Sequence, residues 1–129
     1  MSKENVSVVR GLYEALAAAD MARVFSHFHG EVEHHEPAGL PWGKVHRGHD
    51  GLRALLGILL AKFPCTLLHL DRLYDLGDDE VLVRARLECQ GEMFPYLERV
   101  VVRGGLIREI HTHIDTAAML AQLKRHEAS

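Results

Sequence analysis

The residues best suited to chemistry lie near the C-terminus, in the segment Leu106–Ile114, which we predict to be a β-strand. Ile107, Glu109, His111 and His113 fall at alternating positions there, and Asp115 continues the set just after the strand, so a regular strand presents all five on one face. If this face lines an apolar pocket, two imidazoles and a carboxylate converge where pKa values shift toward neutrality. Such groups suit proton transfer, so we predict that His111, His113 and Asp115 are catalytic.

Asp115 also has a structural explanation. It directly precedes Thr116, where a helix over residues 116–124 is expected, and aspartate is a favoured helix N-cap. The sequence leaves both roles open, because one carboxylate can serve each in part.

A second carboxylate, Glu36, ends an expected strand over residues 31–36. Val32, His34 and Glu36 share one face of this strand, and Pro37 interrupts it. We expect His113 or His111 to pair with Asp115, and Glu36 to lie across the pocket from that pair. A base in such a site can remove a proton next to a carbonyl group, while a second donor protonates the enolate. The alternative is that Glu36 is a solvated residue at a strand end.

The ten histidines also suggest a metal site. His111 and His113 form a His-X-His pair that can hold zinc if His34 or Glu36 supplies a third ligand. The surrounding segment begins like a cupin metal motif, but the required glutamate is missing, and the expected helices come first in the chain, unlike in a cupin. Because the histidines are dispersed, we expect no metal and no cofactor.

Composition limits the class of protein. The chain has 129 residues, of which 47% are hydrophobic and 26% charged, so we expect one domain over residues 1–129. A formal net charge of -3 argues against binding nucleic acid or acidic lipid. Cys65 and Cys89 make no disulfide framework and fit a reducing compartment, and neither a secretion signal nor a membrane span is recognisable. We therefore expect a cytoplasmic protein.

The hydrophobic periodicity changes along the chain. Helical spacing marks residues 5–19, 20–28 and 50–63, whereas residues 66–74, 81–90, 93–103 and 106–114 alternate like strands. Short turns join these last four strands, so they should form an antiparallel meander. An antiparallel sheet needs its apolar face covered, and helices that cover a curled sheet leave a pocket between the two layers.

Segments 12–20, 32–37, 46–52 and 105–111 resemble the SnoaL-like polyketide cyclase group of the nuclear-transport-factor-2-like superfamily, which includes ketosteroid isomerase and limonene epoxide hydrolase. The resemblance in element order covers nearly the whole chain. It implies an α+β fold in which a curved antiparallel sheet wraps around helices as a cone with an apolar pocket, a cystatin-like α+β roll. The superfamily also contains non-catalytic domains, so the fold does not select the activity.

The resemblance also suggests roles for individual residues. In the cyclases an aspartate at the end of the last strand is the acid/base, and Asp115 occupies that place. Glu36 followed by proline is similar to the pair that contains the general base of ketosteroid isomerase. Tyr13 matches the tyrosine of that enzyme that binds the oxyanion, and Glu98 falls near the second acid of its oxyanion hole.

Glu98, Tyr13 and the loop residue Trp42 each have two explanations. Facing inward beside Tyr96, Glu98 should have a pKa raised by burial and stay protonated, whereas facing outward it pairs with an arginine. Tyr13 can simply line the core. Trp42, in a loop rich in proline and glycine, either closes the pocket over a flat ligand or packs on the surface.

Together these observations predict cofactor-independent acid/base chemistry on a small hydrophobic carbonyl compound, of the polyketide cyclase or isomerase type. The expected catalytic residues are Asp115, Glu36, His113 and His111. The expected substrate-binding residues are Tyr13, His34, Trp42, Tyr96 and Glu98. We also expect a homodimer formed through the outer face of the sheet. The alternative is a non-catalytic ligand-binding or dimerisation domain of the same fold.

Overall fold

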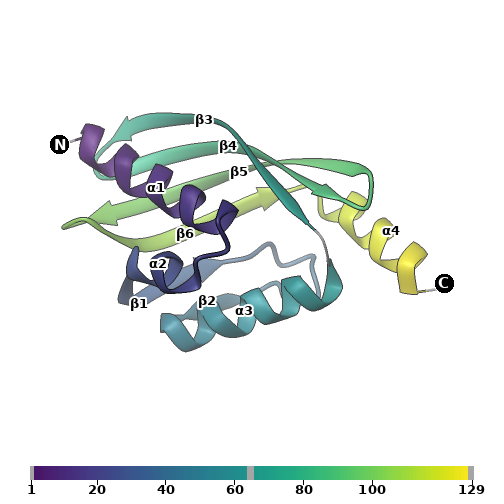
Figure 1. Ribbon diagram of the computed structural model, residues 1–129. Coiled ribbons are helices and arrows are strands. Elements are labelled where there is room, and N and C mark those ends of the chain that lie inside the picture. Colours follow the sequence, from purple (N-terminus) through teal and green to yellow (C-terminus); the bar gives the residue numbers. More distant parts are fainter. Residues whose placement is uncertain (1, 64–65, 128–129) are drawn as a thin grey trace.

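The computed structural model describes residues 2–63 and 66–127, in which helices and strands follow nearly the expected order (Figure 1). The described helices are α1 (Ser2–Ala17), α2 (Met21–Ser26), α3 (Gly48–Lys62) and α4 (Thr116–Glu127). The described strands are β1 (Phe28–His35), β2 (Val45–Arg47), β3 (Leu67–Gly77), β4 (Glu80–Cys89), β5 (Glu92–Arg103) and β6 (Leu106–Ile114). The three-residue β2 was not expected, because it is too short to produce an alternating pattern. Cys65 lies outside the described residues.

The strands form one curved sheet in the order β2-β1-β6-β5-β4-β3. Strands β3 to β6 make the predicted antiparallel meander. β1 pairs in parallel with β6, so the sheet is mixed. Parallel neighbours need a long connection, and here β2, α3 and the strands β3 to β5 lie between β1 and β6 in the chain. The predicted curved α+β fold is confirmed, with this one parallel pairing added.

A β-bulge interrupts the last strand. Val101 of β5 lies opposite Glu109, whereas its neighbour Val102 lies opposite Ile107, so β6 contains one extra residue, Arg108. An extra residue resets the alternation of side chains between the two faces of a sheet. The alternate positions of β6 that face inward are therefore not the same before and after the bulge.

The core divides into two clusters of buried side chains. One joins α1 and α2 to the sheet and includes Val9 and Ile107, both 0% exposed. The other contains Leu55 of α3, Met119 of α4 and Trp42. In Figure 1, α1 and α3 lie along different parts of the curved sheet, so the sheet wraps around the space between them. Among the described residues, no helix has the length and apolar character needed to cross a bilayer.

Candidate active site

A cavity of about 160 Å³ lies between the helices and the concave face of the sheet. Most of its wall is apolar and comes from leucines of α1, α3 and the meander. The described polar or aromatic side chains with a hydrogen-bonding group in this wall are Tyr13, His34, Glu36, Trp42, Tyr96, Glu98 and Thr112. Polar groups in such a low-dielectric environment interact more strongly than they would in water.

Six of the nine predicted site residues line this cavity. All five predicted substrate-binding residues are among them, and the sixth is the predicted catalytic residue Glu36. The orientation expected for β1 is confirmed, because Val32 is buried and both His34 and Glu36 face the cavity. The loop tryptophan, Trp42, is 3% exposed and lines the cavity rather than packing on the surface.

The other three predicted catalytic residues do not line the cavity, so the expected orientation of β6 is wrong. His113 and Asp115 are exposed, and His111 lies on the opposite face of the sheet, where its Nε2 is 3.0 Å from Oε1 of Glu109. The physical reason is the bulge at Arg108. It separates Ile107, which faces inward, from the histidines that simple alternation would have placed beside it.

Asp115 has the contact expected of a helix cap. Its Oδ1 accepts a hydrogen bond from the backbone N–H of Ala118 at 3.0 Å, in the first turn of α4. This contact satisfies an N–H group that has no partner inside the helix. The structure therefore agrees with the cap explanation of Asp115 and not with an orientation toward the cavity.

Thr112 is the cavity residue that the sequence analysis missed. After the bulge, Ile110, Thr112 and Ile114 form the inward set of β6, and all three line the cavity. The signal was present in the sequence, because two isoleucines in one alternating set indicate the buried face more directly than histidines do.

His34 and Glu36 form a buried pair. Nε2 of His34 lies 3.0 Å from Oε2 of Glu36, and their side chains are 12% and 7% exposed. Trp42 donates its indole N–H to the other carboxylate oxygen, Oε1, at 3.1 Å. His34 lies near the end of β1, and Glu36 and Trp42 lie in the segment that follows it. All three side chains face the cavity, where they meet.

The pair favours its charged form. Burial by itself lowers the pKa of His34, but the hydrogen bond and charge of Glu36 outweigh it, so the pKa is raised. Burial by itself raises the pKa of Glu36, but the hydrogen bond and charge of His34, with the nearby Thr112 hydroxyl and the hydrogen bond from Trp42, leave this pKa lowered. A carboxylate only accepts hydrogen bonds, so Nε2 of His34 carries the hydrogen. The other ring nitrogen, Nδ1, is buried and has no hydrogen-bond partner among the described residues.

Glu98 lies in a second group of hydrogen bonds. Tyr13 donates to its Oε1 at 2.7 Å and Thr112 donates to its Oε2 at 3.0 Å. The hydroxyls of Tyr13 and Tyr96 are 2.8 Å apart. Burial is the largest effect on Glu98 and raises its pKa, as expected for an inward-facing residue, although the charge of His34 and the two donors partly oppose it. Burial likewise raises the pKa of both tyrosines, which remain neutral phenols.

Thr112 links the two groups. Its Oγ1 is 3.2 Å from Nε2 of His34 and donates to Glu98, so one hydroxyl connects the imidazole to the second carboxyl group. Glu36 and Glu98 therefore share one cavity with pKa values shifted in opposite directions. Two carboxyl groups separated in this way can supply a base function and an acid function at the same pH.

The metal site considered from the sequence does not form. His34 and Glu36 line the cavity, which His111 and His113 do not. Among the described residues, no group of three ligand atoms within 4.8 Å of one another joins His34 or Glu36 to both of these histidines. His34 is the one imidazole among the described residues of the cavity wall.

Comparisons with known proteins relate this chain to one family. A family model described as a SnoaL-like domain matches residues 9–110. The crystal structure of TerC, co-crystallised with polyporic acid, is 19% identical, with a TM-score of 0.87 over 94% of this chain and 98% of TerC. A putative SnoaL-like polyketide cyclase from Jannaschia sp. CCS1 is 18% identical, with a TM-score of 0.76 over 92% of this chain and 90% of that one.

A third solved structure is an NTF2-like protein of unknown function from Burkholderia pseudomallei. It is 22% identical, with a TM-score of 0.82 over 92% of this chain and 95% of the other. A comparison with curated proteins gives no match. At these identities the solved structures establish the fold, and the family model covers most of the chain. This protein therefore belongs to the SnoaL-like domain family.

Proposed function

We propose that the cavity catalyses cofactor-independent proton transfer on a small hydrophobic carbonyl compound, in a reaction of the polyketide cyclase or isomerase type. The observation that carries this proposal is the state of His34. Its Nε2 is held by Glu36, while its buried Nδ1 has no hydrogen-bond partner among the described residues, in a cavity whose wall is mostly apolar. A buried polar atom without a partner is costly, and a ligand atom would satisfy it.

In this proposal His34 is the group that exchanges the proton. Glu36 accepts the hydrogen on Nε2 and so fixes the tautomer, which leaves the lone pair of Nδ1 in the neutral ring free. Nδ1 then removes a proton from the carbon next to the carbonyl group. Glu36 stabilises the imidazolium that results, and the raised pKa of His34 makes it a stronger base than a free imidazole.

Glu98 supplies the acid function. Its raised pKa favours the protonated form of this carboxyl group, and both of its oxygens already accept hydrogen bonds, from Tyr13 and Thr112. The hydrogen of the protonated group is then left for the oxygen of the substrate. A donor in a low-dielectric site stabilises the enolate oxygen as negative charge develops on it.

The comparisons support the same class of ligand. The family described as SnoaL-like matches most of the chain, one structural relative is a putative polyketide cyclase, and another was crystallised with polyporic acid. The apolar wall of the cavity favours a hydrophobic molecule, and the few polar groups converge from β1, β5 and β6 to orient it.

The test measures exchange of α-hydrogens for deuterium. A panel of bicyclic aryl ketones is incubated with the protein in deuterium oxide, and proton NMR follows loss of the α-hydrogen signal. We expect the protein to accelerate exchange, and His34→Gln to reduce the acceleration by roughly a hundredfold or more, as expected on loss of a general base. Fluorescence of Trp42, the only tryptophan of the chain, reports ketone binding separately.

His113→Gln is the matched control, because His113 is exposed on the outer face and the same substitution there should leave exchange unchanged. Saturable binding of a ketone without accelerated exchange contradicts the proposal and favours the non-catalytic ligand-binding alternative. Equal losses in the two variants also contradict it, because the two histidines lie on opposite faces of the sheet.

A further inference from the structure

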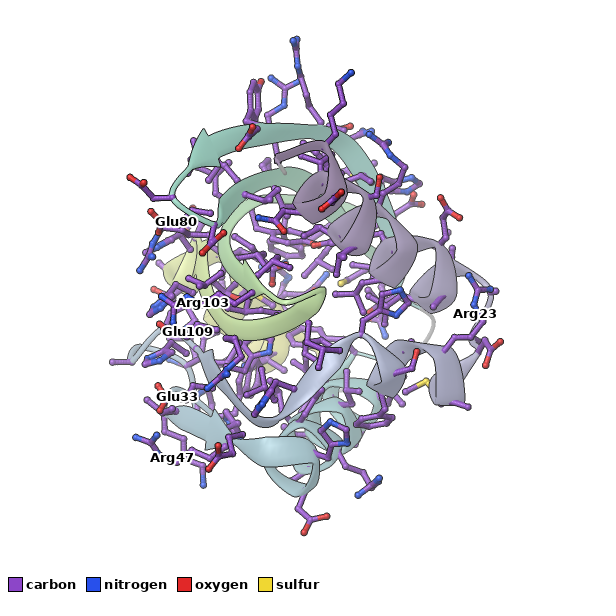
Figure 2. All side chains as sticks on the ribbon, turned by 90° about the vertical axis from the view of Figure 1, so that its left-hand side faces the viewer. Arg23, Glu33, Arg47, Glu80, Arg103 and Glu109 are labelled. Atoms are coloured by element: carbon purple, nitrogen blue, oxygen red, sulfur yellow. The ribbon has the colours of Figure 1, made fainter. Side chains whose placement is uncertain are left out.

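A cluster of histidine and glutamate side chains lies on the outer face of the sheet, on the far side from the cavity. β1 and β6 run in parallel there, with Glu33 opposite Glu109 and His35 opposite His111. Figure 2 shows Glu33 and Glu109 on the same side of the molecule, opposite Arg23 of α2. The pairing thus sets two imidazoles and two carboxylates side by side on adjacent strands.

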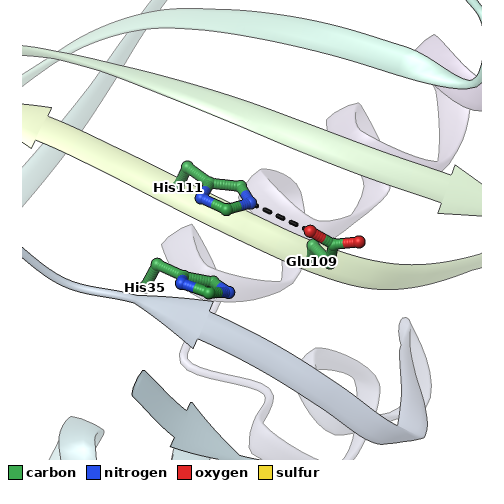
Figure 3. Close-up of side chains that lie close together, drawn as sticks. All are labelled: His35, Glu109 and His111. Carbon is green, nitrogen blue, oxygen red and sulfur yellow. Dashed lines mark hydrogen bonds and ion pairs between the residues drawn. The ribbon is translucent and has the colours of Figure 1, made fainter. Parts of the chain in front are cut away.

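Three of these side chains converge closely. One potential ligand atom from each of His35, Glu109 and His111 lies within 4.8 Å of the other two. The two rings are stacked, with centroids 4.1 Å apart and planes inclined by 18°. Figure 3 shows the rings lying over one another, with Glu109 at the end of His111 that bears Nε2.

The donor set fits a divalent transition-metal ion. Two imidazoles and one carboxylate form a known zinc-binding combination that leaves a fourth position to water. At zinc bond lengths, tetrahedral ligands lie roughly 3.4 Å apart. Nε2 of His111 and Oε1 of Glu109 are already 3.0 Å apart, and the other separations, at most 4.8 Å, need to shorten by up to about 1.4 Å. Rotation of the side chains can supply this movement, because all three are partly exposed, by 31%, 35% and 22% for His35, Glu109 and His111.

Neighbouring charges support the cluster. Oε1 of Glu33 is 3.1 Å from Nε2 of His35, and Arg47 of β2 forms an ion pair with the other oxygen of Glu33. A carboxylate held in this way can orient the adjacent imidazole or accept its displaced proton, as outer partners of metal ligands do. Room for solvent is present as well, since a depression of about 290 Å³ borders His35 and His111, together with His113, Glu36, Pro37, Thr112 and Ile114.

We propose that His35, Glu109 and His111 bind one divalent transition-metal ion, with zinc as the probe, on the outer face of the sheet. The site is independent of the cavity, because its ligands occupy the outward positions of β1 and β6. Imidazole and carboxylate donors without a thiolate select a borderline ion of this type over calcium or magnesium, which prefer oxygen ligands alone.

The experiment is a calorimetric titration of the tag-free protein, stripped of metal with a chelator and dialysed, with zinc chloride. We expect saturable binding of one ion per chain. Replacing a ligand, as in His111→Gln or Glu109→Gln, should weaken binding by at least about tenfold. Absence of saturation at millimolar zinc overturns the proposal.

Two control variants separate this cluster from ordinary surface histidines. His69 lies 2.9 Å from Glu88 on the meander and is 36% exposed, but it belongs to no group of three ligand-type residues among the described residues. His113 lies two positions beyond His111 on the same strand. His69→Gln and His113→Gln should bind zinc as the unsubstituted chain does, and an equal loss in either control overturns the site.

A second measurement needs no variant and so does not depend on a variant folding. Long-range proton–nitrogen NMR spectra of the unsubstituted protein resolve the ring nitrogens of histidines. Zinc should shift the signals of His35 and His111 together and leave those of His69 in place. Movement of all histidines in parallel indicates non-specific binding and rejects the proposal.

Discussion

Nε2 of His34 lies 3.0 Å from Oε2 of Glu36, and both side chains are almost enclosed in an apolar cavity. Each residue shifts the pKa of the other in the direction that favours the ion pair, against the effect of burial. The pair therefore links the protonation of the candidate site to the stability of the fold.

The first prediction concerns this linkage. The raised pKa of His34 gives stabilisation that is complete below its ordinary value of 6.5 and is lost as the pH rises through the raised value. The lowered pKa of Glu36 gives stabilisation that is complete above 4.5 and is lost as the pH falls through the lowered value. The pair should therefore contribute most between 4.5 and 6.5.

Urea unfolding across pH tests this window. Glu36→Gln leaves His34 without its charged partner and should reduce the free energy of unfolding by up to about 3 kcal/mol where the pair is fully formed. The difference from the unsubstituted protein should shrink on both sides of the window. A difference that does not vary with pH would show that the two groups are not linked.

The second prediction concerns Glu98. Because its pKa is raised in the fold, its protonated form is favoured, and stability should fall as the pH rises from 4.5 through the raised value. Glu98→Gln imitates the protonated group and should remove this part of the pH dependence. Glu98→Ala instead leaves Tyr13 and Thr112 without their acceptor and should cost about 1–3 kcal/mol. Unfolding curves at acid and alkaline pH distinguish the variants, and an unchanged pH dependence in Glu98→Gln would refute the prediction.

The third prediction concerns the loop residue Trp42. Trp42→Phe keeps an aromatic ring in the cavity wall but removes the hydrogen bond to Glu36, so stability should fall by about 1 kcal/mol. The pKa of Glu36 should rise, because one of the bonds that lower it is gone. Carbon NMR of the carboxyl group measures the pKa and thermal unfolding measures stability. An unaltered pKa would mean that the indole N–H does not act on this carboxylate.

The fourth prediction separates the two explanations of Asp115. As a helix cap, Asp115→Ala should lower stability by about 1 kcal/mol, whereas Asp115→Asn should lose less because asparagine also caps helices. Neither substitution should change the rate of α-hydrogen exchange. Thermal unfolding and the exchange assay measure the two quantities on the same samples. Loss of exchange in Asp115→Asn with stability intact would assign Asp115 a chemical role despite its outward position.

The two strands that carry the site differ in how well the sequence predicted them. In β1, strict alternation correctly placed Val32, His34 and Glu36 on the inner side. In β6, the same rule started from Ile107 and failed at Arg108, because a single inserted residue exchanges the two faces beyond it. A bulge leaves little trace in composition, so the alternation of Ile110 and Ile114 was the better guide.

The partners of Thr112 and the parallel pairing of β1 with β6 could not be predicted from local sequence patterns, for a different reason. The hydroxyl of Thr112 matters because β1 lies next to β6, and this neighbour relation joins residues far apart in the sequence. Turn signals specify which strands of a meander are adjacent, but no short turn connects β1 to β6. The sequence therefore predicted the individual strands without indicating that these two meet.

The parallel contact between β1 and β6 also has a consequence for how the chain folds. His34 and Thr112 are 78 positions apart, so forming their contact closes a long loop, and the entropy of that closure must be overcome before the contact contributes stability. On the ribosome, β1 emerges early but waits for β6, the last of the described strands in chain order, before its parallel partner exists. A nascent chain that stalls before β6 therefore exposes an unpaired edge of β1, which is a template for aggregation until β6 is made.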